Sequence, residues 1–111
     1  MAVTDLVAVP KAVDNIEITA DIDAGTLIGY DGAVCAAGAQ CVGVTMYDHE
    51  SGEMAACFRG KVPVVLGATV AAGARIESDA SGLAITLASG VALGFVYEGG
   101  DAGDTVMAFL T

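Results

Sequence analysis

The stretch VPVVLGATVAAGARIESDASGLAITL, residues 62–87, decides the fold class of this chain. It begins with the apolar run 62–66 and ends with a second apolar run, 83–87. Between them, Arg75, Ile76 and Glu77 alternate polar and apolar, which is typical of a strand with one buried face. Residues 78–82 contain Asp and Gly, which favour a turn because Asp hydrogen-bonds nearby backbone and Gly accepts positive φ. The stretch therefore predicts short β-strands joined by tight turns.

The same pattern continues on both sides of this stretch. Ile16, Ile18 and Ala20 alternate with Glu17 and Thr19, which is the clearest period-two pattern in the chain. Turn residues recur about every 8–12 positions, a spacing typical of a β-sandwich or small barrel. We expect an all-β, single-domain sandwich or barrel of eight to ten short strands and no convincing helix. The strands expected most clearly are residues 16–20, 41–47, 53–59, 92–98 and 105–110.

Two local features refine this expectation. The runs 41–47 and 53–59 flank the polar turn DHESG, residues 48–52, and are expected to pair as a hairpin. Gly43 and Gly94 lie inside predicted strands, which indicates a bulge or a close approach of another backbone segment.

The chain of 111 residues is expected to form one domain, because this length is ordinary for a single domain. We expect an N-terminal arm at residues 1–12, which ends near Pro10, and a β-rich domain at residues 13–111. More than half of the residues are apolar, but most are small, and only six are aromatic. A core of small side chains buries little surface, so burial against other subunits is expected to add stability.

The charge is strongly acidic, with 14 acidic residues, four basic residues and a net charge of −10. Such a charge repels nucleic acid and anionic membranes, so neither is an expected partner. Both solubility and a basic partner surface would explain it. No apolar run is long enough to span a membrane.

The three cysteines, Cys35, Cys41 and Cys57, are odd in number and have no CxxC spacing. Together with a single histidine they make a poor zinc site. We therefore expect three free thiols in a reducing cytoplasm, and a Cys35–Cys41 bridge has no positive support in the sequence. No signal peptide is recognisable, so synthesis in the cytoplasm is expected.

No pattern of residues indicates catalysis. His49 is the only histidine and lies in the DHESG turn with Ser51, where neighbouring side chains seldom hold the geometry of a nucleophile and its base. The glycine-rich run 99–104 contains acids and no lysine, so it does not suit a phosphate. A cupin-like small β enzyme is a less favoured alternative, because it would need more histidines. We expect no enzyme activity, cofactor or metal.

An ordered series of motifs resembles a known family. A GTLIGYDG strand, residues 25–32, leads to VGV at residues 42–44 and to FRGKVPV at residues 58–64. A G-x-x-V-x-x-G step follows at residues 67–73, and an ALGFV strand at residues 92–96. In this order the motifs resemble the capsid cement, or head decoration, proteins of tailed bacteriophages. The resemblance covers residues 24–110, and the first 15 residues match nothing in it.

The resemblance implies a structural virion protein without enzyme activity. Such proteins bind the major capsid protein on the outer surface of the DNA-filled head and stabilise it. They act as small homo-oligomers, with trimers favoured over dimers, and are made in the cytoplasm of the host bacterium. A homo-oligomeric β-fold binding module unrelated to capsids is the alternative.

Two sets of residues are candidates for these contacts. The arm is expected to bind the capsid through its apolar side chains, Val3, Leu6, Val7 and Val9. The subunit interface is expected around Phe58, Arg59, Lys61 and Val62, because these two bases stand in an otherwise acidic chain.

Overall fold

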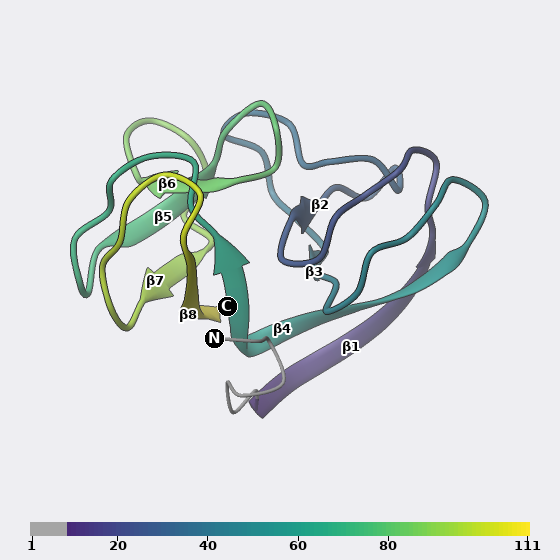
Figure 1. Ribbon diagram of the computed structural model, residues 1–111, viewed down its shortest axis with the longest axis horizontal. Helices are drawn as coiled ribbons and strands as arrows, with labels where there is room; N and C mark the ends of the chain where they lie inside the picture. The colour runs from purple at the N-terminus through teal and green to yellow at the C-terminus, as the bar shows by residue number, and fades with distance from the viewer. Residues whose placement is uncertain (1–8) are drawn as a thin grey trace.

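The computed structural model describes the backbone of residues 9–111 and the side chains of residues 14–111. This part of the chain forms eight strands and no helix (Figure 1). The strands are β1 (Val9–Glu17), β2 (Leu27–Ile28), β3 (Gly43–Val44), β4 (Met54–Val65), β5 (Arg75–Ser78), β6 (Ala84–Thr86), β7 (Gly94–Val96) and β8 (Thr105–Leu110). Within the described range, no helix is long and apolar enough to cross a membrane. The predicted all-β fold is confirmed.

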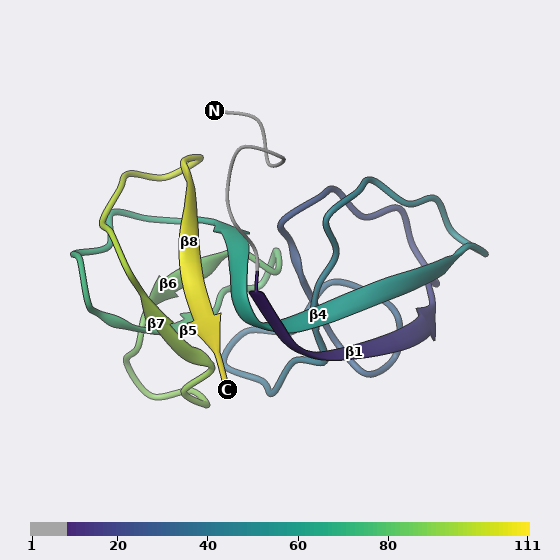
Figure 2. The same ribbon diagram turned by 90° about the horizontal axis from the view of Figure 1, so that it is seen from below.

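The strands form one sheet in the order β2-β3-β4-β8-β7-β5-β6, and β1 pairs with β4 from outside this path. Every pairing between named strands is antiparallel. A parallel bridge between Leu66, just after β4, and Ala84 of β6 connects the last strand of this order back to the end of β4. Strands β4 to β8 therefore make a nearly closed barrel at one end of the molecule (Figures 1 and 2).

Strand β4 connects this barrel to a second lobe. Its first half pairs with β1 and β3, and its second half pairs with β8. The strand bends where it passes between the lobes (Figures 1 and 2), and Gly60 within it has a φ of 93°. Only glycine adopts such a φ without strain, so this residue lets one long strand serve both lobes.

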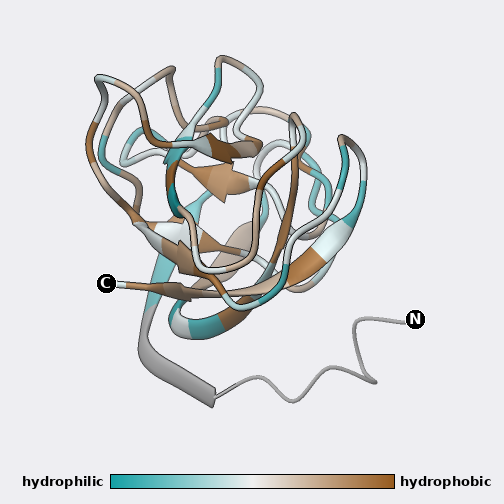
Figure 3. Cartoon of the chain, turned by 90° about the vertical axis from the view of Figure 1, so that its left-hand side faces the viewer, coloured by the Kyte–Doolittle hydropathy of each residue, from teal (hydrophilic) through white to brown (hydrophobic). Residues whose placement is uncertain are grey.

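Each lobe has its own apolar core. The larger core lies in the barrel and includes Val62, Val64 and Leu66 of the opening sequence stretch. The smaller core lies under β1 and includes Ile18, Ile28 and Cys57. Hydrophobic colour in Figure 3 is concentrated on the strands and hydrophilic colour in many of the loops, as expected for strands that bury one face.

Several strand boundaries differ from those predicted. Strand β1 begins at Val9 rather than near residue 16, so it includes residues 9–12 that were assigned to the arm. Its alternating residues continue past Glu17, but the Ile18 N–H donates to the Glu53 carbonyl and not to a strand partner. The predicted strand 41–47 shrinks to β3, although the Val42 N–H still donates to the carbonyl of Ile28 in β2. Strand β8 has the predicted bounds.

The predicted hairpin and the close backbone approaches are both present. Strands β3 and β4 pair antiparallel, with Val44 opposite Phe58. At Gly43, a Cβ atom would lie 2.9 Å from the Phe58 carbonyl carbon, and at Gly94 it would lie 2.8 Å from that of Phe109. Real side chains do not approach backbone this closely, so both positions require glycine.

The prediction of three free thiols is wrong. Cys35 and Cys41 form a disulfide, with their Cα atoms 5.8 Å apart, and Cys57 is the free cysteine. The intervening loop turns back through Gly38, which has a φ of 67°. This reversal brings both sulfurs into the larger core. Sequence spacing alone does not reveal that reversal.

Candidate binding surfaces

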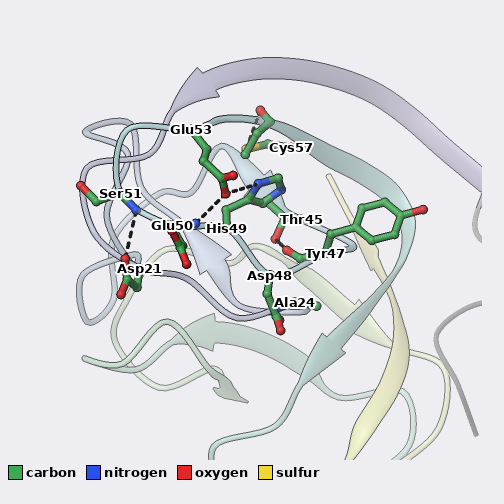
Figure 4. Close-up of polar contacts among 11 residues, drawn as sticks. Asp21, Ala24, Thr45, Tyr47, Asp48, His49, Glu50, Ser51, Glu53 and Cys57 are labelled. Carbon is green, nitrogen blue, oxygen red and sulfur yellow. Dashed lines mark hydrogen bonds and ion pairs between the residues drawn. The ribbon is translucent and has the colours of Figure 1, made fainter.

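The polar turn that holds the histidine is a structural turn. His49 pairs through its backbone with Ile22, which joins the turn to the loop after β1. Its Nδ1 atom lies 3.5 Å from Glu53 Oε1. The Ser51 N–H donates to Asp21 Oδ1 at 3.0 Å, and no hydrogen bond is found between the His49 and Ser51 side chains (Figure 4).

The same two loops form an acidic end of the molecule. We use this name for five exposed acids: Asp21, Asp23, Asp48, Glu50 and Glu53. Backbone donors fix three of them, since Asp48 Oδ1 accepts from the Ala24 N–H at 2.9 Å and Glu53 Oε1 accepts from the Glu50 N–H at 2.6 Å. Among residues 14–111, no group of three or more His, Cys, Asp or Glu could hold a metal ion. The acidic end is therefore a preorganised charged surface.

One acid, Glu77, is buried, in contrast to the exposed acids of the acidic end. Glu77 is only 6% exposed and borders an open hollow together with Gly38 and Gly90. Its Oε1 atom accepts a hydrogen bond from the Ala88 N–H. This hydrogen bond satisfies the buried carboxylate. Glu77 therefore has a structural role, because it joins the loop after β6 to β5.

The outer face of the barrel carries a row of residues in register across four strands. Lys61 of β4 lies opposite Phe109 of β8, Phe109 opposite Phe95 of β7, and Phe95 opposite Arg75 of β5. We call these four residues, together with Tyr97, the cation–aromatic row. Lys61 and Arg75 thus lie at the two ends of the row with Phe109 and Phe95 between them, and their backbones are roughly 14 Å apart because neighbouring strands lie about 4.8 Å apart.

The rings of the row pack on one another. Phe95 stacks on Phe109 with ring centroids 6.0 Å apart and meets Tyr97 edge-to-face at 5.2 Å. Lys61 Nζ lies 5.4 Å from the centre of the Tyr97 ring, within the range of a cation–π contact. Phe95 is 37% exposed and Tyr97 is 46% exposed. The row is therefore ordered before any partner binds it.

The predicted interface residues fall in different environments. Phe58 is half-buried against the larger core, and Arg59 Nη2 lies 3.6 Å from Asp14 Oδ2 within the same chain. Lys61 belongs to the cation–aromatic row. Val62 is fully buried in the larger core, so its inclusion in a surface contact was wrong. The strand alternation that exposes Lys61 turns Val62 inward.

The predicted capsid-binding residues lie mostly outside the described chain. Val3, Leu6 and Val7 belong to residues 1–8, which the structure does not describe. Val9 opens β1 and lies opposite Lys61. Sequence reasoning missed Arg75, Phe95 and Tyr97, because only the strand register brings them beside Lys61. The alternation in residues 105–110 predicts the face on which Phe109 lies, but it does not predict which residues of other strands lie beside it.

Comparisons with known proteins give one family match and one similar fold. The family described as "Phage cement protein" matches residues 9–110, which is nearly the whole chain. Among solved structures, the head fiber gp8.5 N base of bacteriophage phi29 is similar, with a TM-score of 0.77 and 14% sequence identity. The match covers 90% of this chain and 93% of that one. At this identity the likeness concerns the fold alone. No curated protein matches the chain.

Proposed function

Because this chain belongs to the phage cement protein family, we propose that it binds the outer surface of the capsid and stabilises the DNA-filled head. The observation that carries the proposal is the family match over residues 9–110. The similar fold of a head fiber base supports a place on the phage head. On this proposal the protein works by binding the major capsid protein and catalyses no reaction.

A binding experiment tests this function directly. Heads that lack the protein are mixed with the purified chain and sedimented, and their resistance to heat is measured by release of DNA. We expect the chain to sediment with the heads and to raise the temperature of DNA release. A chain that stays in the supernatant and leaves the heads unchanged would overturn the proposal. It would favour a homo-oligomeric binding module unrelated to capsids.

We further propose that the N-terminal segment supplies part of the attachment. Its apolar residues Val3, Leu6 and Val7 precede Val9, where the paired backbone of β1 begins. Burial of three such side chains would stabilise attachment by about 5–8 kcal/mol. Ordering of eight residues opposes it by about 8 kcal/mol or more, at about 1–2 kcal/mol each, so this burial at best offsets the cost. One segment alone would bind weakly, so two or three segments on one oligomer would be needed.

Two variants test the segment. One deletes residues 2–8 and keeps Val9, and the other replaces Val3, Leu6 and Val7 with serine in the full-length chain. We expect both to keep the circular dichroism spectrum and sedimentation of the parent but to lose co-sedimentation with heads. Full decoration by both variants would show that the segment has no role in attachment.

Self-association completes the proposal. A homo-oligomer, with a trimer favoured over a dimer, would present several attachment segments to one shell. Sedimentation equilibrium of the isolated protein measures this assembly without any capsid present.

A further inference from the structure

We infer that the cation–aromatic row of one copy binds the acidic end of a second copy, so that the protein assembles head to tail. This rests on the proposed self-association and names its two surfaces. The row comprises Lys61, Arg75, Phe95, Tyr97 and Phe109, and the acidic end comprises Asp21, Asp23, Asp48, Glu50 and Glu53.

The distribution of charge selects the row as the complement of an acidic surface. The chain has four basic residues, and two of them, Lys61 and Arg75, belong to the row. Arg59 is already paired with Asp14 of its own chain. No ion pair involves Arg75 in the described part of the protein, and its side chain is exposed. Among the described side chains of a chain with net charge −10, this face thus offers a second acidic copy two cations.

The two surfaces lie on different lobes, and no ion pair joins them within the described part of the molecule. Strands β5, β7 and β8 lie in one lobe, whereas the turn 48–52 pairs with the loop after β1 in the other lobe (Figures 1 and 2). The molecule measures 35 Å along its longest axis. A second copy can therefore bring an acidic end to the row of the first.

The symmetry of the contact follows from the signs of the charges. A two-fold contact of row with row would place the Lys61 and Arg75 side chains of one copy against those of the other. A contact between two acidic ends would place acids against acids. Row against acidic end avoids both repulsions. Such a contact joins different patches of the two copies and therefore closes into a ring or continues as a filament.

Apolar burial supplies the rest of the association. Exposed ion pairs contribute only about 0–1 kcal/mol each. Charge alone would therefore determine which surfaces meet but would not give a stable complex. Phe95 and Tyr97 offer exposed rings in the row. The acidic end offers Tyr47, which is 71% exposed and points away from the turn (Figure 4). Aromatic side chains of this kind commonly anchor protein interfaces.

Charge reversal tests the inference. One variant carries Lys61→Glu with Arg75→Glu, and a second carries Asp23→Lys with Glu50→Lys. All four side chains are exposed or half-buried, and none forms an ion pair within the described part of the native chain, so the fold should persist. We expect each variant to associate at least about tenfold more weakly than the parent in sedimentation equilibrium, because like charges then face each other.

The chain that carries all four reversals is the matched control. Its net charge equals that of the parent, −10, since two reversals of each sign cancel. Recovery of association in this chain supports the pairing of row and acidic end. Arg75→Gln provides a milder variant, expected to weaken association less than the double reversal does.

The opposite results are equally specific. If either double variant assembles as the parent does, or if the four-reversal chain fails to recover while its circular dichroism spectrum is native, the inference is overturned. A row variant that assembles normally but no longer binds heads would assign the row to the capsid instead. Because the measurements of self-association omit heads, they can fail while the capsid-binding proposal stands.

Discussion

Replacement of Gly94 by alanine tests how closely the barrel strands approach one another. Gly94 lies in β7 with Leu110 of β8 on one side and Ile76 of β5 on the other. An added Cβ atom would overlap the Phe109 carbonyl oxygen and lie 3.0 Å from the Leu110 Cα atom. All of these are backbone atoms that cannot turn away, so β7 must separate from β8.

The expected loss of stability has two parts. The φ of Gly94 is 148°, a conformation that costs a residue with a side chain roughly 1–3 kcal/mol. Separation of β7 from β8 would break about two backbone hydrogen bonds at about 1 kcal/mol each. We therefore expect the Gly94→Ala variant to lose about 3–5 kcal/mol, a large share of the 5–15 kcal/mol typical of a domain.

Gly73→Ala is the matched control. Gly73 also has a positive φ, 78°, but no atom lies within 4 Å of its added Cβ. We expect a cost of about 1–2 kcal/mol from the backbone conformation alone. Urea unfolding followed by circular dichroism at one protein concentration would measure both variants, because self-association makes stability depend on concentration. A Gly94→Ala variant no less stable than Gly73→Ala would refute the close approach.

Three other results are expected. Replacement of Cys35 and Cys41 by serine should cost about 2 kcal/mol, since the bridge closes a short loop, and reduction of the parent chain should lower its melting temperature to match. Thiol titration should find one thiol per denatured, unreduced chain, and that of Cys57 should react slowly in the native protein, because burial, helped by the nearby charge of Asp14, raises its pKa to about 11. Glu77→Ala should cost about 1–3 kcal/mol in urea unfolding, because the Ala88 N–H loses its acceptor, whereas an unchanged midpoint would show that water replaces the carboxylate.

The sequence by itself determined the fold class and several local features. Alternation of polar and apolar residues predicted β8 with its bounds, because a strand with one buried face imposes a period of two. Gly43 and Gly94 inside predicted strands indicated close backbone approaches, because glycine lacks a Cβ atom. The ordered motifs between residues 24 and 110 indicated the family, and the match begins earlier, at residue 9.

Only the tertiary structure decided which distant residues meet. The Cys35–Cys41 bridge depends on how a loop turns back into the core, which no residue spacing specifies. The burial of Val62 and the partial exposure of Lys61 depend on which face of β4 the barrel covers. The cation–aromatic row requires the registers of β4, β8, β7 and β5 together. A strand pattern determines which residues share a face, whereas long-range pairing determines which strands lie side by side.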